Sequence, residues 1–216
     1  MSMKKLMSQN SRYRIYKADL GQLYDVTKFV VSENYKHHNE KMLDNMVEDI
    51  QSVYNEELSY FPKSYIYVVE DFRGEMIGCI RVMKWDKKDE LPIQRIFNIN
   101  PLQCIKKGGD MTFWHIGRFA INSLANASGI SLFKQLMIFA IVPICKSLNG
   151  YMIAECDSKL LKIMNRLGID TRRLGEGISY LGSETIPVYA DRKGLLRFYS
   201  NFKHLYYDTN LSVSSN

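Results

Sequence analysis

Residues 111–121 are apolar enough to form a buried strand, yet they include two ionisable side chains, His115 and Arg118. Burial of a charge is unfavourable unless the charge has a partner or a function, so this strand is the first candidate for a functional site. Histidine titrates close to neutral pH, which suits a general base that takes a proton from a substrate. The alternative for His115 is a satisfied histidine that lies beside Trp114. Strand alternation places Arg118, three residues later, on the opposite face.

The segment after this strand, residues 122–131, is rich in small residues and precedes a strongly apolar helix. The N-terminus of a helix behind such a loop can bind an anion such as phosphate, because its backbone N–H groups are unpaired. Ser128 and Gly129 begin this helix and are the candidate phosphate contacts. An ordinary helix cap is the alternative.

The elements that must position these residues follow from hydrophobic periodicity and from turn and cap signals. The order of strands and helices predicts an α/β domain (α+β by class) around a mixed, mostly antiparallel sheet with one parallel crossover and flanking helices. The predicted strands are residues 13–18, 64–70, 75–84, 111–121, 150–155, 171–181 and 184–191. The predicted helices are residues 20–32, 39–54, 129–148, 158–167 and 193–202, the third of them interrupted or kinked at Pro143.

The sequence predicts one domain over residues 13–205, without internal repeats or a linker rich in proline or serine. Residues 1–12 and 206–216 are polar and are expected to be a mobile N-terminus and a mobile tail. Residues 85–110 are charged and irregular, and within them residues 91–96 are expected to form a short strand or an edge.

The composition is that of a globular protein with a modest excess of positive charge. Of 216 residues, 46% are hydrophobic, and 29 Lys and Arg against 23 Asp and Glu give a net charge of +6. This excess is either an ordinary solvated surface or an attraction for an acidic partner, such as nucleic acid, an anionic membrane or an acidic carrier protein. Nucleic acid is not expected, because no binding motif is present and the aromatic residues lie mostly in apolar patterns.

The cysteines and the hydropathy indicate a soluble protein of a reducing compartment, the cytoplasm. Residues 1–13 have no apolar signal-peptide core, and the uncharged run at residues 136–145 is far shorter than the ~20 residues of a membrane span. There is no C-x-x-C motif among the four widely spaced cysteines, which are Cys79, Cys104, Cys145 and Cys156.

No metal site is expected. His37 and His38 with Glu40 are the strongest metal candidates, but adjacent residues on one helix or loop do not easily converge on one ion. A solvated start of a helix explains them better.

The strand motif resembles a known family. His115–Ile121 is similar to the motif Glu-[Leu/Ile]-[Ser/Gly]-Arg-[Phe/Leu]-Ala-[Val/Ile] of the LuxI-type acyl-homoserine lactone synthases and the related N-acyl amino acid synthases, a branch of the GNAT acyltransferase fold. Gly78–Arg81 is similar to that family's upstream Gly-x-x-Arg, and residues 150–173 resemble its strand and acid-capped helix. The resemblance covers roughly residues 13–200.

Two departures from the family pattern matter. His115 stands where the family has the glutamate proposed as its base. Residues 124–129 contain one glycine and replace the glycine-rich phosphate loop of GNAT enzymes that use acetyl-CoA. The LuxI-like branch also lacks that loop, and it commonly takes acyl chains from acyl carrier protein.

The resemblance implies an enzyme that moves a long-chain acyl group from acyl carrier protein or acyl-CoA to a primary amine such as an amino acid. His115 would be the base. Arg81 and Arg118 would be structural or would bind the carboxylate of the acceptor, because a guanidinium binds carboxylates in a bidentate manner. The equally open alternative for the two arginines is a buried ion pair with an acidic residue such as Glu70 or Glu75.

The resemblance also implies how the donor would be held. The backbone of the strand end would pair with the amides of the phosphopantetheine arm, and the start of the next helix would hold the single phosphate of that arm or the pyrophosphate of CoA. These residues are Phe119, Ala120, Ile121, Ser128 and Gly129.

Part of the apolar surface of residues 132–142, with the 11 methionines, leaves room for a long acyl chain, although most of that helix must be core. The basic pairs at residues 106–107, 172–173 and 192–193, with Arg197, would attract an acidic carrier if they cluster. The alternatives are a short-chain N-acetyltransferase that uses acetyl-CoA and a binding module that has lost catalysis. The acceptor, the chain length and the oligomeric state stay open.

Overall fold

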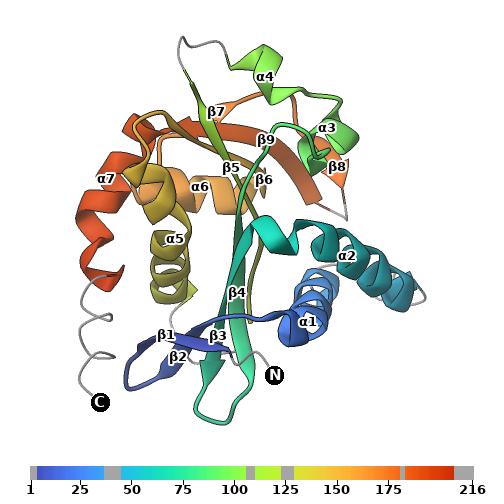
Figure 1. The fold of residues 1–216 in the computed structure, drawn as a ribbon, viewed down its shortest axis with the longest axis vertical. Coiled ribbons are helices and arrows are strands. Elements are labelled where there is room, and N and C mark those ends of the chain that lie inside the picture. The colour runs from blue at the N-terminus through green and yellow to red at the C-terminus, as the bar shows by residue number, and fades with distance from the viewer. Residues whose placement is uncertain (1–3, 37–44, 106–109, 123–128, 181–182, 207–216) are drawn as a thin grey trace. The chain divides into compact units, whose positions relative to one another are not determined.

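The computed structural model describes residues 4–36, 45–105, 110–122, 129–180 and 183–206. Its strands form a nine-stranded, mostly antiparallel sheet with helices beside it (Figure 1), which confirms the predicted fold class. The strands are β1 (Lys5–Gln9), β2 (Tyr13–Lys17), β3 (Ser64–Asp71), β4 (Met76–Lys84), β5 (Thr112–Ile121), β6 (Gly150–Asp157), β7 (Arg172–Arg173), β8 (Ile178–Tyr180) and β9 (Ser183–Asp191). The α-helices are α1 (Leu23–Lys36), α2 (Met46–Tyr60), α3 (Pro92–Phe97), α4 (Pro101–Cys104), α5 (Gly129–Lys146), α6 (Ser158–Arg166) and α7 (Arg192–Phe202).

The chain divides into two compact units, and the single domain over residues 13–205 stays a prediction. Unit 1 comprises residues 1–81, 118–140 and 202–216, and unit 2 comprises residues 82–117 and 141–201. Each unit is therefore made of separate pieces of the chain.

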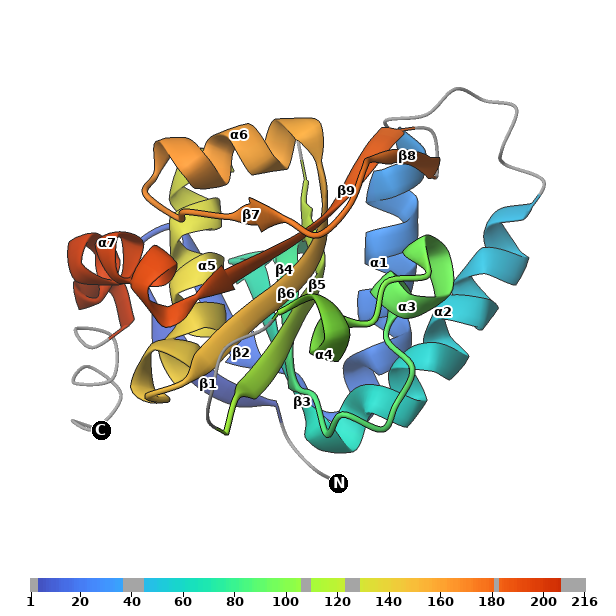
Figure 2. The same cartoon turned by 90° about the horizontal axis from the view of Figure 1, so that it is seen from above.

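Unit 1 is built on antiparallel pairing of β1 with β2 and of β2 with β3, in which Ile15 lies opposite Val69. Helices α1 and α2 lie side by side (Figures 1 and 2). Apolar residues at helical spacing on α1, among them Leu23, Val26 and Val30, pack against β3 residues in a core that excludes water.

Unit 2 is built around β6. The β5 strand pairs with β6 in parallel, and β9 pairs with β6 antiparallel on the other side. In Figure 2, α6 and α3 lie on opposite sides of β6. On the α6 side, the sulfur of Met164 is 3.8 Å from that of Cys156. Because side chains alternate along a strand, the neighbouring Glu155 points to the other side.

Helix α5 has the length and apolar composition that could cross a membrane, and it is the one such helix among the described residues. Two thirds (67%) of it is buried within the protein, as in the core helix of a globular domain. Pro143 lies inside the helix, where it removes the backbone N–H that would bond to the carbonyl of Phe139.

The structure differs from the sequence predictions mainly in short or edge elements. Lys5–Gln9 form the edge strand β1 rather than a mobile segment. The prediction of a strand at residues 91–96 is wrong, because Pro92 begins helix α3 and the Gln94 side chain accepts a hydrogen bond from the backbone N–H of Leu91. The predicted strand 171–181 is divided into β7 and β8. The predicted start of the second helix, at residues 39–44, and nearly all of the predicted tail lie outside the described residues.

Candidate functional site

His115 lies in unit 2, where it is hydrogen-bonded to an acidic residue of the neighbouring strand. Its Nε2 is 2.8 Å from Oε2 of Glu155. The His115 side chain is 1% exposed and that of Glu155 is 12% exposed. The buried strand therefore carries its ionisable side chain with a partner, as the cost of burying a polar group requires.

His115 and Glu155 lie at the end of the parallel ladder between β5 and β6. The register runs from Thr112 opposite Gly150 to His115 opposite Ile153. Glu155 is two residues beyond Ile153 and so points to the same face, one step further along the strand. From Ala154 onward, β6 continues its pairing with β9 as far as Asp157. The pair thus stands where β5 and β6 cease to be partners in the ladder.

Arg118 belongs to unit 1 and has an unusual backbone. Its φ of 53° is in the left-handed region, which few residues other than glycine adopt. The alternation of side chains along β5 is interrupted at this residue. Strand alternation therefore no longer predicts that Arg118 faces away from His115. A strained conformation of this kind persists where surrounding contacts hold it.

Those contacts are ion pairs with two neighbouring glutamates of α2. Arg118 donates from Nε to Oε1 of Glu57 over 2.8 Å and from Nη2 to Oε2 of Glu56. The second oxygen of Glu57 is 3.1 Å from Nε of Arg81, whose guanidinium also lies 5.1 Å from the centre of the Tyr60 ring. Glu57 therefore bridges two arginines inside unit 1.

The electrostatics of this cluster are those of a buried ion network. Burial would lower the pKa of the Arg118 guanidinium, but Glu57 and Glu56 together raise it above its ordinary value. Arg81 is 1% exposed and the Glu57 side chain is 3% exposed. The carboxylates that sequence reasoning named for this role lie elsewhere, because Glu70 pairs with Lys4 at 2.6 Å and Glu75 lies 3.7 Å from Arg73.

The residues predicted to hold the donor lie at and beyond the end of β5, in unit 1. Phe119 packs edge-on against Phe133 at 5.5 Å, and Ala120 is part of the core with α1. Ile121 is half-buried, and Gly129 is the exposed first residue of α5. Ser128 lies outside the described residues.

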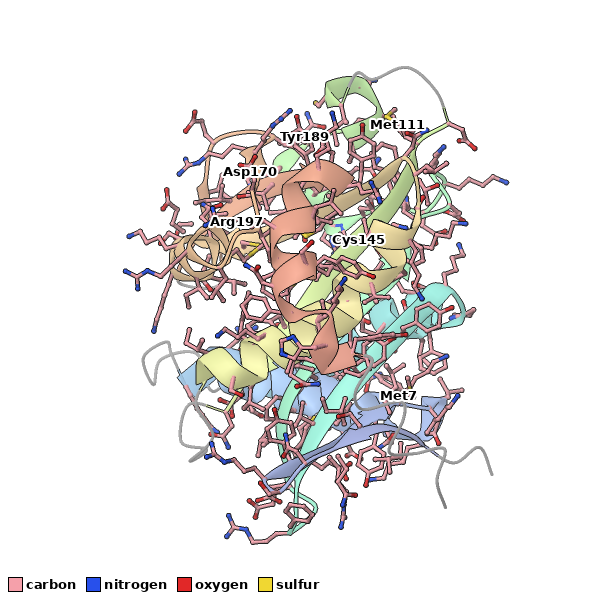
Figure 3. All side chains as sticks on the ribbon, turned by 90° about the vertical axis from the view of Figure 1, so that its left-hand side faces the viewer. Met7, Met111, Cys145, Asp170, Tyr189 and Arg197 are labelled. Carbon is pink, nitrogen blue, oxygen red and sulfur yellow. The ribbon has the colours of Figure 1, made fainter. Side chains whose placement is uncertain are left out.

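Three of the basic residues singled out in the sequence come together in unit 2. Arg172, Lys193 and Arg197 line one open depression of about 720 Å³ at the end of α6 and the start of α7, which we call the basic depression. Asp170 and Asp191 also line it, and Figure 3 shows Asp170 beside Arg197.

The charged side chains of the basic depression differ in how they are engaged. Oδ1 of Asp191 accepts a hydrogen bond from the backbone N–H of Gly194 over 3.0 Å and so caps α7. The backbone N–H of Asp170 donates to the carbonyl of Gly194 over 2.9 Å, and Asp170 itself is exposed. A hydrogen bond with the Tyr189 side chain, and the charge that this side chain would carry, raise the pKa of Arg172.

The net charge of the chain is concentrated in this part of unit 2. Residues 158–173 and 192–202 contain eight Lys and Arg and one Asp. The rest of the chain has 21 basic and 22 acidic residues, so these two segments account for the whole excess of positive charge. The exposed basic side chains among them are Lys159, Lys162, Arg166, Arg172, Arg173, Lys193 and Arg197.

Sequence reasoning missed Glu155, Glu56 and Glu57. Glu155 had a usable signal, because a carboxylate inside the apolar strand 150–156 is as anomalous as His115. Glu56 and Glu57 follow an amphipathic pattern on α2 that gives no sign of a partner 62 and 61 residues away. No group of acidic, histidine or cysteine side chains suited to a metal ion occurs among the described residues, and His37, His38 and Glu40 lie outside them.

The comparisons with known proteins bear on the fold. No protein-family model and no curated protein sequence matches the chain. The AHL synthase LasI is 18% identical, over 87% of this chain and 94% of its own, with a TM-score of 0.55. FeeM, an N-acyl amino acid synthase from uncultured soil microbes, is 12% identical, over 84% of this chain and 90% of its own, with a TM-score of 0.59. FdhC, a nucleotide-linked sugar GNAT, is 8% identical over 94% and 97%, with a TM-score of 0.53. The chain therefore has the GNAT fold.

Proposed function

We propose that this protein is an N-acyltransferase that moves an acyl group from a thioester donor to a primary amine, with His115 as the general base. The observation that carries the proposal is the buried hydrogen bond between His115 and Glu155 at the end of the β5–β6 ladder, in a chain with the GNAT fold. An amino acid acceptor is supported by the similarity to FeeM, which is named an N-acyl amino acid synthase.

The reaction needs a proton acceptor close to the amine. The neutral amine attacks the thioester carbonyl with its lone pair, and His115 takes one proton from the attacking nitrogen. The tetrahedral intermediate collapses with cleavage of the C–S bond. The products are an amide and a free thiol, which takes up the proton.

Direct attack by the amine is supported by the burial of three of the four cysteines. Burial raises the pKa of Cys145 to about 12 and holds the pKa values of Cys79 and Cys156 above the ordinary thiol range. A buried thiol of this kind has little thiolate at neutral pH and is a poor nucleophile.

We assign Arg81 and Arg118 to the ion-pair network with Glu57 rather than to the acceptor carboxylate. Both guanidinium groups are engaged by carboxylates within unit 1. We propose that the pantetheine arm binds along the backbone of Phe119, Ala120 and Ile121. Its phosphate would lie at the start of α5, at Ser128 and Gly129.

We propose acyl carrier protein, rather than free acyl-CoA, as the donor. The basic depression and the eight-to-one excess of basic residues in its two segments support an acidic protein partner. The protein would act in the cytoplasm, in keeping with four free cysteines.

The first experiment mixes the purified protein with long-chain acyl carrier protein or acyl-CoA and a pool of the twenty amino acids. Thiol release is followed, and products are extracted for mass spectrometry. Release of thiol with a new N-acyl amino acid mass supports the proposal and identifies the acceptor. Donor binding without thiol release above the acceptor-free control contradicts it and favours a binding module, and turnover with acetyl-CoA alone favours a short-chain acetyltransferase.

The donor is tested with a charge variant, Arg172→Gln/Lys193→Gln/Arg197→Gln. We expect kcat/KM for acyl carrier protein to fall about 10-fold or more, with that for acyl-CoA little changed, because surface charge acts mainly on encounter with the protein. The matched control, Lys5→Gln/Lys28→Gln/Lys84→Gln, removes the same number of exposed charges elsewhere. Equal losses in the two variants would contradict a docking role for the basic depression.

A further inference from the structure

We infer that the basic depression of unit 2 binds a small phosphorylated polyol, a molecule that carries a phosphate group and neighbouring hydroxyl groups. The inference goes beyond the proposed acyl transfer and does not depend on it, because it concerns binding alone. It starts from the lining of the basic depression. Among the described residues that line it, Ile169 alone has an apolar side chain, and the others are charged, polar or glycine. Such a lining suits a hydrophilic ligand rather than an acyl chain.

The basic depression has the size and the accessible cations that a small anion needs. Its volume of about 720 Å³ falls within the range of about 300 to 1,000 Å³ that is usual for small-molecule sites. Arg172, Lys193 and Arg197 are all exposed, so a ligand reaches them from solvent. Arg172 is held by its hydrogen bond with the Tyr189 side chain. Lys193 and Arg197 make no ion pair with another described residue, so their charges are available to an anion.

Two close approaches to glycine backbone hold the walls of the basic depression in place. Gly168 has a φ of +93°, and a Cβ on it would lie 2.9 Å from Cγ and Cδ of Arg197. The aliphatic part of Arg197 therefore packs directly on this backbone. A Cβ on Gly194 would lie 2.5 Å from the carbonyl oxygen of Asp170, which brings Asp170 close against the start of α7. Groups that are already held lose less conformational freedom when a ligand binds.

A neutral hydrogen-bond donor stands among the cations. The hydroxyl of Thr171 donates to Oδ1 of Asn165 over 3.1 Å, and both residues line the basic depression. This bond fixes the amide of Asn165 and leaves Nδ2 as a donor. Guanidinium and ammonium groups, together with an amide N–H, form a donor set that suits the oxygens of a phosphate.

The carboxylate of Asp170 distinguishes this site from one for a bare anion. Asp170 is exposed, lies beside Arg197 in Figure 3, and makes no side-chain hydrogen bond or ion pair with another described residue. A carboxylate repels phosphate, but it accepts hydrogen bonds from hydroxyl groups. A ligand with both groups satisfies the cations with its phosphate and Asp170 with its hydroxyls. Sugar phosphates and the ribose phosphate part of nucleotides have this combination.

An ordinary solvated surface is the competing explanation, since exposed lysines and arginines are common. The two explanations differ in what they predict for hydroxyl groups. A solvated surface would attract every anion according to its charge, and hydroxyl groups on the ligand would add nothing. A site that recognises a phosphorylated polyol prefers it to inorganic phosphate, and the preference depends on Asp170.

The experiment is isothermal titration calorimetry of the purified protein, at low ionic strength and without a thioester donor. The ligands are ribose 5-phosphate, inorganic phosphate, ribose and adenosine monophosphate. We expect ribose 5-phosphate to bind about 10-fold or more tightly than inorganic phosphate, because hydrogen bonds from its hydroxyls to a charged acceptor add to the phosphate contacts. Ribose alone should give no measurable heat. Tighter binding of adenosine monophosphate than of ribose 5-phosphate indicates a nucleotide, and equal or weaker binding indicates a sugar phosphate.

Variants assign the binding to the basic depression. The triple variant Arg172→Gln/Lys193→Gln/Arg197→Gln should lower the affinity for ribose 5-phosphate about 10-fold or more, and the matched control of the donor test should change it less than about 2-fold. Asp170→Ala should reduce the preference for ribose 5-phosphate over inorganic phosphate to less than about 3-fold, because the acceptor of the hydroxyls is gone. Glu184→Ala, at an exposed glutamate of β9, is the control for Asp170 and should keep the preference.

Three results would overturn the inference: no binding of ribose 5-phosphate up to about 10 mM, equal binding by the wild type and the triple variant, or a preference over inorganic phosphate that survives Asp170→Ala. Failure of the proposed carrier docking has a different signature. Because that docking uses the same cations, bound ribose 5-phosphate should raise KM for acyl carrier protein. If the ligand binds as expected and this KM does not change, the ligand site stands and carrier docking at the basic depression fails.

Discussion

Removal of the Glu57 carboxylate should destabilise the protein more than any other single loss of charge in unit 1. Glu57 bridges Arg81 and Arg118, and its side chain is 3% exposed. Glu57→Gln removes the carboxylate charge that lies 3.1 Å from Nε of Arg81, whose side chain is itself 1% exposed. Breaking a buried ion pair from one side costs about 3 to 5 kcal/mol, because the remaining charge stays buried.

The size of this loss can be checked by unfolding. For a chain of this length, 1 kcal/mol corresponds to about 2 to 4 °C in Tm, so Glu57→Gln should lower the first unfolding transition by about 6 to 20 °C. Circular dichroism during heating and denaturant titration measures it. The free energy of unfolding is read from the first transition, because the two compact units need not unfold together.

Two neighbouring variants on α2 serve as controls. Glu56→Gln should cost about 1 to 2 kcal/mol, because Glu56 is 16% exposed and Arg118 keeps its bond to Glu57. Glu48→Gln is exposed and should change the free energy of unfolding by less than about 0.5 kcal/mol. A loss below about 1 kcal/mol in Glu57→Gln, or one equal to that in Glu56→Gln, would refute the argument that Glu57 is the bridging charge.

Three further outcomes are expected. His115→Gln should lower kcat for acyl transfer by about 10² to 10⁴-fold, as loss of a general base does, while its circular dichroism spectrum stays native; activity close to wild type would remove His115 from the mechanism. At pH 8, only the exposed Cys104 of the native protein should react quickly with a thiol reagent, because burial raises the pKa of Cys145 to about 12 and the pKa values of Cys79 and Cys156 further. All four thiols should react in denaturant. Fast reaction of two or more thiols in the native protein would contradict the burial of these cysteines. Gly168→Ala should destabilise unit 2 by about 1 to 3 kcal/mol, because Gly168 has a φ of +93° and a Cβ there would lie 2.9 Å from the aliphatic part of the Arg197 side chain. Unchanged stability in a denaturant titration would contradict this and would show that the Arg197 side chain moves aside without cost.

The sequence predicts the regular elements that have a strong period and misses those defined by a single contact. The apolar spacing on α1 and the turn between β3 and β4 are local signals, and the structure has both elements close to the predicted bounds. Helix α3 depends on Pro92 at its start and on the Gln94 side chain that caps it, so a six-residue pattern of apolar residues was misread as a strand. β1 has no apolar alternation, because an edge strand needs only one neighbour.

In the candidate site, too, residues with a local signal in the sequence were predicted and their distant partners were not. His115 and Arg118 stand out in the sequence because charge in an apolar strand is unfavourable without compensation. Their partners were not predicted, because Glu155 and Glu57 are 40 and 61 residues away and only the order of strands and helices brings them close. The carboxylates that the sequence analysis named as possible partners of the two arginines, the exposed Glu75 of the hairpin and Glu70, are both engaged elsewhere.

The division of the chain into units has a practical consequence for dissecting the protein. The chain passes from one unit to the other after residues 81, 117, 140 and 201, and these points fall within β4, β5, α5 and α7. A truncation at any of them would cut a hydrogen-bonded strand or helix rather than a connecting loop. Unit 1 would need three separate peptides to be reassembled, and unit 2 would need two. Neither unit is therefore available as one continuous fragment of the chain, and the functions of the two units are best separated by point substitutions.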